Sequence, residues 1–194
     1  MLSRIKSGES ADIVVLGEQA VGELVTLGHL LPLSKKPFAV SKVGIGIRVG
    51  EAHPDINTVD QLRNVLTSSR AIAHTINGLS GMYVPTLLEK LGIAEVMTGR
   101  IVTRPGGLIG RVVVAGEADI AVQQISELLA VPGLDLVGPL PNEVQKEFCS
   151  YVGIFKNSQN QESGEKFLKF LATPELASLF KSKGLDWVAP SDEK

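Results

Sequence analysis

Cysteine is nearly absent from this sequence, because Cys149 is the only one among 194 residues. A single cysteine cannot form an intrachain disulfide, so cysteine usage leaves the cellular compartment open. Its neighbours in the segment FCSYV, residues 148–152, are typical of a buried strand. We therefore expect Cys149 to be an inert core residue and not a catalytic thiol.

Aromatic residues and excess positive charge are also scarce. Only 5% of the residues are aromatic, which argues against stacking platforms for carbohydrate or single-stranded nucleic acid. The formal net charge is −2, so the chain has no general attraction to phosphate backbones. We predict that nucleic acid is not a partner.

Long apolar runs are missing as well. No stretch approaches the length of a membrane-spanning helix, and residues 1–9 (MLSRIKSGE) have neither an apolar core nor a cleavage-site pattern. The given residues are therefore expected to contain no secretory signal. An export signal would have to lie outside them.

Motifs for catalysis and metal binding are absent too. His29, His53 and His74 are scattered, and the sequence has no HExxH, CxxC or GxSxG pattern. The glycine pattern in residues 44–50 (GIGIRVG) has the wrong spacing for a nucleotide loop and is typical of a strand or bulge. We predict no enzyme activity, no metal and no cofactor.

Short apolar β runs that alternate with helical patterns are what the sequence does contain, and they predict an α/β protein with substantially parallel sheets. The length allows one domain or two small lobes. Thr58 and Gln61 form a capping box that begins a helix. Expected strands cover residues 12–17, 38–49, 70–74, 100–103, 119–122 and 148–155, and other expected helices include 19–30, 123–127, 164–171 and 174–180.

Three successive strand ends lead into turns of small or polar residues. The first turn, residues 77–83 (NGLSGMY), opens a helix whose N–H groups can hold an anion. Proline is favoured in the first turn of a helix, so Pro85 could delay the start of this helix from the NGLSGMY turn to about Val84. The other turns are residues 104–107 (RPGG) and the segment that begins at Gln123. In open α/β sheets a ligand lies outside the carboxyl ends of the strands, so we expect a small-ligand site here.

The order and spacing of four segments resemble the type 2 periplasmic solute-binding proteins, and most closely the molybdate-binding components of ABC transporters. These segments are residues 5–15 (IKSGESADIVV), 78–92 (GLSGMYVPTLLEKLG), 115–122 (AGEADIAV) and 167–184 with its spaced phenylalanines and final glycine. The resemblance implies an α/β fold of two lobes with mixed, mostly parallel sheets, the first lobe being incomplete.

By this resemblance, lobe 1 comprises residues 1–45 and 140–194, lobe 2 comprises 46–139, and hinge crossings lie near 38–50 and 137–152. Family members begin with a strand and helix whose serine-bearing turn supplies half of the anion contacts, and this sequence starts after them. We therefore expect either a shortened chain or a homo-oligomer that covers the exposed sheet edge.

The resemblance also assigns ligand-binding positions, at Gly17, Ser80, Gly81, Met82, Arg104, Gly106, Gly107 and Gln124. The family usually has tyrosine where Gln124 stands, which replaces a phenol donor by an amide that can donate or accept. A guanidinium at Arg104 would favour a carboxylate, whereas the alternative is a solvated surface arginine.

The implied function is the capture of a small anion, foremost a molybdate- or tungstate-like oxyanion, for an ABC permease. The two lobes would close on the ligand in the periplasm or outside the cell. An organic-acid receptor, the effector-sensing domain of a regulator, which would be cytoplasmic, and a degenerate homologue that binds nothing remain alternatives.

Overall fold

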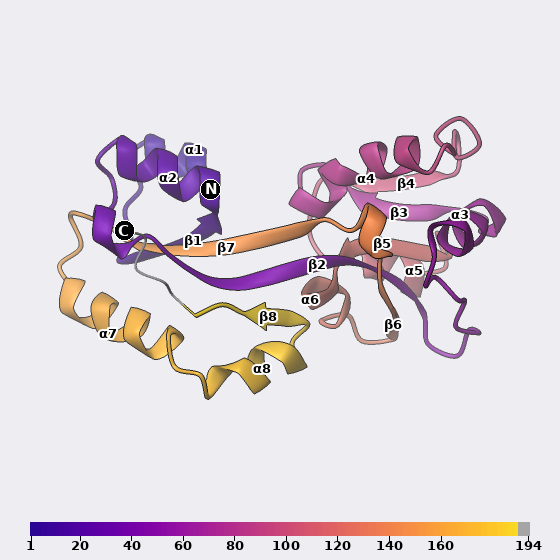
Figure 1. The fold of residues 1–194 in the computed structure, drawn as a ribbon. Helices are drawn as coiled ribbons and strands as arrows, with labels where there is room; N and C mark the ends of the chain where they lie inside the picture. Colours follow the sequence, from indigo (N-terminus) through magenta and orange to yellow (C-terminus); the bar gives the residue numbers. More distant parts are fainter. Residues whose placement is uncertain (190–194) are drawn as a thin grey trace. The chain divides into compact units, whose positions relative to one another are not determined.

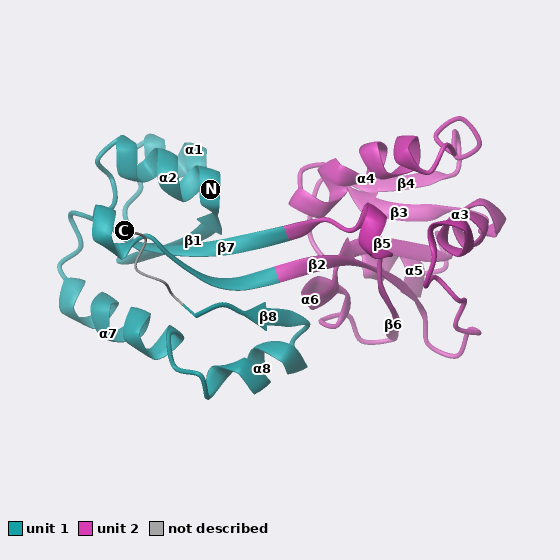
Figure 2. Ribbon diagram, in the orientation of Figure 1, with its two compact units in different colours: residues 1–40, 148–194 teal, residues 41–147 magenta. Residues whose placement is uncertain are grey.

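Two strands, β2 (Lys36–Arg48) and β7 (Glu147–Ile154), carry the chain between two structural units in the computed structural model, which describes residues 1–189 (Figure 1). Of the described residues, unit 1 contains 1–40 and 148–189, and unit 2 is Ser41–Glu147 (Figure 2). The sequence analysis placed the boundaries between the two lobes after residues 45 and 139. The observed boundaries lie within the segments expected as hinge crossings, and a hinge action stays a prediction.

Unit 1 is a small sheet covered on both faces. Its strands are β1 (Ile13–Gly17), which pairs antiparallel with β7, and β8 (Leu185–Trp187), which pairs with β2. Side chains alternate across the sheet, so Val14 and Tyr151 pack with α1 (Leu2–Lys6) and α2 (Glu18–Thr26). Val152 packs on the other face with α7 (Gln161–Leu171) and α8 (Leu176–Ser182). A short 3₁₀ helix, η1 (Pro32–Ser34), precedes β2.

Cys149 lies in β7 and is half-buried against the α1 and α2 side of unit 1. Burial, and secondarily the negative charge of Glu18, raise the pKa of its thiol. The thiol form is therefore favoured over the nucleophilic thiolate, which agrees with the role expected from the sequence.

Unit 2 is built on a mixed sheet, as the resemblance implied, in which parallel and antiparallel pairs both occur. β2 pairs antiparallel with β5 (Ile120–Gln124) and β6 (Leu134–Pro139), while β3 (Ile72–Thr75) pairs parallel with both β5 and β4 (Ile101–Arg104). The predicted GIGIRVG strand is confirmed, because residues 44–48 lie within β2 and its ladder shifts register between Ile45 and Gly46. The α/β prediction is thus confirmed.

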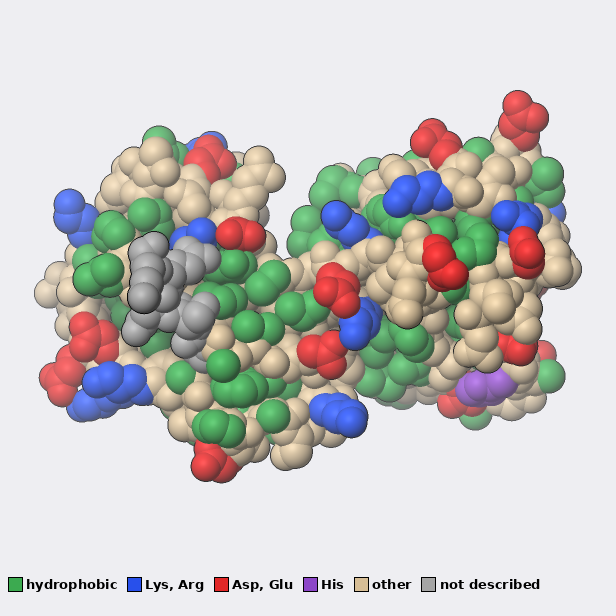
Figure 3. Space-filling view, viewed as in Figure 1, with side chains coloured by type: hydrophobic (Ala, Val, Ile, Leu, Met, Phe, Trp, Pro, Cys, Tyr) green, Lys and Arg blue, Asp and Glu red, His purple; other side chains and the backbone are tan. Residues whose placement is uncertain are grey.

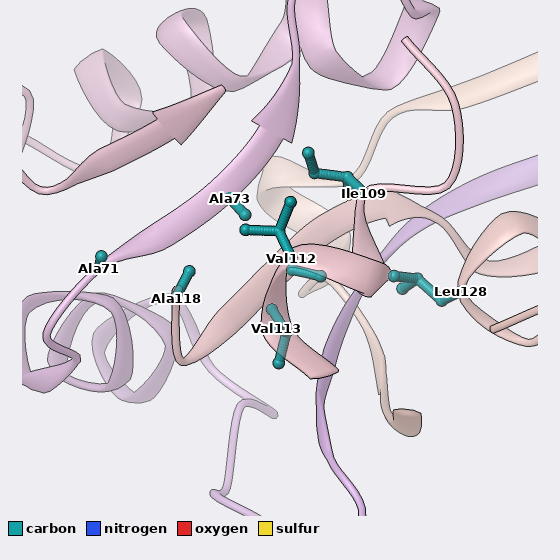
Figure 4. Packing of buried hydrophobic residues seen from close by; sticks show 8 residues of the cluster. Ala71, Ala73, Ile109, Val112, Val113, Ala118 and Leu128 are labelled. Carbon is teal, nitrogen blue, oxygen red and sulfur yellow. The ribbon is translucent and has the colours of Figure 1, made fainter. Parts of the chain in front are cut away.

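Helices cover both faces of this sheet. They are α3 (Val59–Ser68), α4 (Leu79–Lys90), α5 (Gly110–Val114) and α6 (Ile125–Leu128), with a 3₁₀ turn η2 (Asn142–Val144). α4 packs on β3 and β5, and α5 packs on the opposite face through Val112 and Val113 (Figure 4). Small side chains at Ala71, Ala73 and Ala118 let α5 approach the sheet closely.

Local signals at the helix starts had different outcomes. The capping box is confirmed, because the Gln61 N–H donates to Thr58 Oγ1 at 3.2 Å and the Thr58 N–H donates to Gln61 Oε1 at 2.9 Å. α4 begins at Leu79, so the later start near Val84 is wrong and Pro85 lies inside the helix. The expected helix at 123–127 begins only at Ile125, because Gln123 and Gln124 continue the ladder of β5 with β2.

Candidate functional site

The carboxyl ends of β3, β4 and β5 meet at one edge of the unit 2 sheet. Parallel pairing aligns Thr75, the last residue of β3, with Arg104, the last residue of β4. β5 runs parallel on the other side of β3 and ends at Gln124. Each strand then leads toward a helix: α4 after β3, α5 after β4 and α6 after β5. This edge is where the sequence predicted a small-ligand site.

The start of α4 carries N–H groups that no side chain caps. Gly78 is the N-cap, and the first helical hydrogen bond runs from the Met82 N–H to the Gly78 carbonyl at 2.9 Å. The N–H groups of residues 79–81 therefore have no partner within the helix, and they carry the positive end of its dipole. An anion placed here would accept hydrogen bonds from these N–H groups and would be stabilised by the positive end of the helix dipole.

Two buried hydroxyls flank this helix start. Thr75 is 2% exposed and Ser80 is 1% exposed, and neither hydroxyl oxygen has a hydrogen-bond partner among residues 1–189. Leaving a buried polar group unsatisfied costs about 1–3 kcal/mol, and native proteins contain few such groups. A ligand that accepts hydrogen bonds would remove this cost.

Glycine is required where α4 meets the end of β3. A Cβ at Gly81 would lie 1.8 Å from the Thr75 carbonyl oxygen, and a Cβ at either Gly78 or Gly81 would lie 2.5 Å from Thr75 Oγ1. These glycines therefore let the helix start sit directly against the strand end. The small residues of the NGLSGMY turn thus have a steric role that brings the two hydroxyl-bearing segments together.

The glycine turn after β4 is held by a side chain that the sequence analysis missed. Gln123 is 2% exposed, its Nε2 donates to the Gly107 carbonyl at 2.8 Å, and its Oε1 accepts from the Ile109 N–H at 2.9 Å. Gly107 has φ +88°, a conformation that favours glycine, whereas Gly106 is exposed with open space around its Cα. The sequence feature that could have indicated this role is the pair of glutamines at the end of an otherwise apolar strand.

Gln124 points away from Gln123, because successive strand residues face opposite sides of the sheet. Its Nε2 donates to Glu127 Oε2 at 3.2 Å. Glu127 is half-buried, and burial raises the pKa of its carboxyl group while the hydrogen bonds from Gln124 partly oppose this. Sequence reasoning also missed Glu127, since a single glutamate on a short helix carries no distinctive pattern.

Arg104 is engaged by an acidic neighbour. Its Nη2 donates to Glu117 Oε2 at 2.6 Å and its Nη1 donates to the Thr103 carbonyl at 3.0 Å. The guanidinium charge is therefore compensated within unit 2. Its predicted contact with a ligand stays a prediction.

The remaining predicted residues fall in two places. Met82 lies in the first turn of α4 and is 56% exposed, and Ile76 and Leu79 in the same segment are also exposed. Gly17 belongs to unit 1, where it is the N-cap of α2 and is followed by Glu18. The structure therefore brings Ser80, Gly81 and Met82 together at one helix start in unit 2.

The described part of the chain has neither a metal-binding cluster nor a membrane-spanning helix. Residues 1–189 contain no group of histidine, cysteine, aspartate and glutamate side chains that could hold a metal ion. No helix in that range is both long and apolar enough to cross a bilayer. On the face seen in Figure 3, acidic and basic side chains are intermixed on both units.

Comparisons with known proteins give a family and a fold. A family model described as "Bacterial extracellular solute-binding protein" matches residues 1–186. An aconitate isomerase from a Pseudomonas species is 29% identical over 184 residues, which span 94% of this chain and 70% of that protein.

Two solved structures share the fold. The periplasmic molybdate-binding protein of Azotobacter vinelandii superposes with a TM-score of 0.76 at 19% identity, over 98% of this chain and 83% of that one. A Clostridium difficile protein described as the substrate-binding domain of a molybdenum ABC transporter gives 0.75 at 17% identity, over 96% and 81% of the two chains. At these identities the likeness shows the fold alone.

Proposed function

This chain belongs to the bacterial extracellular solute-binding protein family, and we propose that it captures a small anion at the start of α4 for delivery to an ABC permease. The family match and the shared fold confirm the resemblance that the sequence analysis stated. The proposed location is the periplasm or the outside of the cell.

The unsatisfied hydroxyls of Thr75 and Ser80 carry this proposal. Together with the uncapped N–H groups of α4, they form a set of neutral donors that requires an acceptor. Such donors act at short range, whereas the charge of the whole chain is screened over a Debye length of about 10 Å. A slightly acidic protein can therefore bind an anion without a basic cluster.

Two ligand classes are supported by different observations. The names of two proteins that share the fold refer to molybdate or molybdenum, which makes a tetrahedral oxyanion one candidate. The aconitate isomerase relative, at higher identity, supports a carboxylic acid.

We also propose that the crossings within residues 38–50 and 137–152 act as hinges for closure on the ligand. Small-angle scattering with and without ligand would detect such a closure.

Titration calorimetry would test the site itself. The panel contains molybdate, tungstate, sulfate, phosphate, citrate and malate, measured on the wild-type chain and on Ser80→Ala and Thr75→Val. Both variants should bind about tenfold more weakly, the loss of about one hydrogen bond. Thr98→Ala, which removes an exposed hydroxyl, is the matched control. Equal affinity in the wild type and both site variants would refute this assignment.

Isomerisation of an unsaturated acid is a second candidate function, favoured by the aconitate isomerase relative. Incubating the chain with cis-aconitate and following the trans isomer by NMR tests it directly. Turnover would establish an enzyme, whereas binding without conversion would support the capture function.

A further inference from the structure

Donors and acceptors are separated within the candidate site. The α4 side offers the hydroxyls of Thr75 and Ser80 and the N–H groups of the first helical turn, which no side chain caps. The β5 side offers Gln124 and Glu127, which are joined by the hydrogen bond from Nε2 to Oε2. β3 and β5 are neighbouring strands about 4.8 Å apart, so the segments that follow them leave the same edge of the sheet.

Glu127 fixes how the Gln124 amide is presented. An ionised carboxylate only accepts hydrogen bonds, so it must bind the amide nitrogen and not the amide oxygen. Gln124 Oε1 is consequently directed away from Glu127 as an acceptor. The two residues together offer acceptor oxygens and a negative charge, which a fully deprotonated oxyanion cannot satisfy.

Strand alternation places Gln124 on the appropriate face of the sheet, and Glu127 is joined to it by the hydrogen bond already described. Gln123 reaches the turn that leads into α5, so Gln124 is turned to the opposite face, on which α4 packs. The segment that leads into α4 and its first turn also carry exposed apolar side chains, namely Ile76 at 52%, Leu79 at 44% and Met82 at 56% exposure. An inorganic oxyanion has no carbon skeleton to cover such side chains, whereas an organic acid has one.

We propose that Gln124 and Glu127 select a hydroxylated carboxylic acid, whose carboxylate binds the α4 donors while its hydroxyl donates to the Gln124–Glu127 pair. This inference rests on the proposed function, since it names the ligand class of the same site. It makes Glu127 a specificity-determining residue for which the family resemblance gave no role.

Matched pairs of acids that differ by one hydroxyl test the inference. We would titrate citrate against tricarballylate and malate against succinate, with molybdate alongside, by calorimetry on the wild-type chain. The hydroxylated member of a pair should bind at least about tenfold more tightly, because an acid without the hydroxyl leaves a polar group of the site unpaired.

Glu127→Gln should reduce this preference to about threefold or less, because a second amide can turn either its donor or its acceptor to the site. Glu95→Gln removes the same charge from an exposed position after α4 and should keep the full preference. Thermal unfolding and circular dichroism confirm that each variant is folded.

The outcomes separate this inference from the proposed function. If molybdate binds, loses affinity in Ser80→Ala and outcompetes every acid, the hydroxy-acid inference is wrong and the proposed site stands. An unchanged preference in Glu127→Gln overturns the role of Glu127. If hydroxy acids bind and Ser80→Ala has no effect, the site at α4 is wrong; if no probe binds at all, both proposals fail.

Discussion

Removing the Ser80 hydroxyl should stabilise the ligand-free protein, although it weakens ligand binding. The hydroxyl oxygen is buried without a partner, so it is desolvated in the folded state and hydrated in the unfolded state. Ser80→Ala removes that penalty, and we expect the free energy of unfolding to rise by about 1–3 kcal/mol. Thr75→Val should act in the same direction.

Ser69→Ala is the matched comparison within unit 2. Ser69 is also buried, at 9% exposure, but its Oγ donates to the Leu66 carbonyl at 2.8 Å. Its replacement leaves that carbonyl without the bond and should lower the free energy of unfolding by about 1 kcal/mol. The two serine variants should therefore shift stability in opposite directions.

Urea unfolding followed by circular dichroism measures both changes, and thermal unfolding gives a second readout of about 2–4 °C per kcal/mol for a chain of this size. A saturating ligand should narrow the stability difference between Ser80→Ala and the wild type by about 1.4 kcal/mol, because the wild type binds about tenfold more tightly. The reasoning is refuted if Ser80→Ala destabilises the free protein as much as Ser69→Ala does, since the hydroxyl would then be satisfied.

Other substitutions test the supports of the site. Gly81→Ala should destabilise unit 2 by about 3 kcal/mol or more in urea unfolding, because the new Cβ meets the Thr75 carbonyl, whereas Gly106→Ala, with open space around it, should be neutral or slightly stabilising. Gln123→Ala should lower stability by about 2 kcal/mol, since it leaves the Gly107 carbonyl and the Ile109 N–H without their side-chain partner; no change in unfolding would count against its role. Because burial raises the pKa of Glu127 above its ordinary value of 4.5, the folded state binds its proton more tightly than the unfolded state. Its contribution to stability is therefore present at acidic pH and is lost as pH rises through the raised pKa. In urea titrations the free energy of unfolding of the wild type should therefore fall relative to that of Glu127→Gln over that interval.

Local patterns in the sequence were sufficient for much of the fold. The Thr58 capping box, the long β2 strand and the helix after the NGLSGMY turn depend on neighbouring residues, and the structure confirms them. The start of α4 was left open because Pro85 fits a first helical turn. Tertiary packing against the end of β3 decides for Leu79 instead.

The chemistry of the site depends on contacts between distant residues, which spacing does not reveal. Glu117 engages Arg104 across the chain, and Gln123 reaches back to the Gly107 turn. The missing partners of Thr75 and Ser80 become visible only when every neighbour is placed. The sequence therefore predicted the position of the turn, but it did not predict that the hydroxyl groups of Thr75 and Ser80 lack hydrogen-bond partners.

The division of the chain between the units also sets an order for folding during synthesis. Unit 2, which holds the candidate site, is one continuous segment, whereas β1 of unit 1 must wait for β7, because Ile13 pairs with Ile154. At about 5–20 residues per second the ribosome leaves β1 without its partner for roughly seven to thirty seconds. The nascent chain therefore exposes the apolar strand of unit 1 while unit 2 is being synthesised, so chaperones should bind the segment around β1 until β7 emerges directly after unit 2.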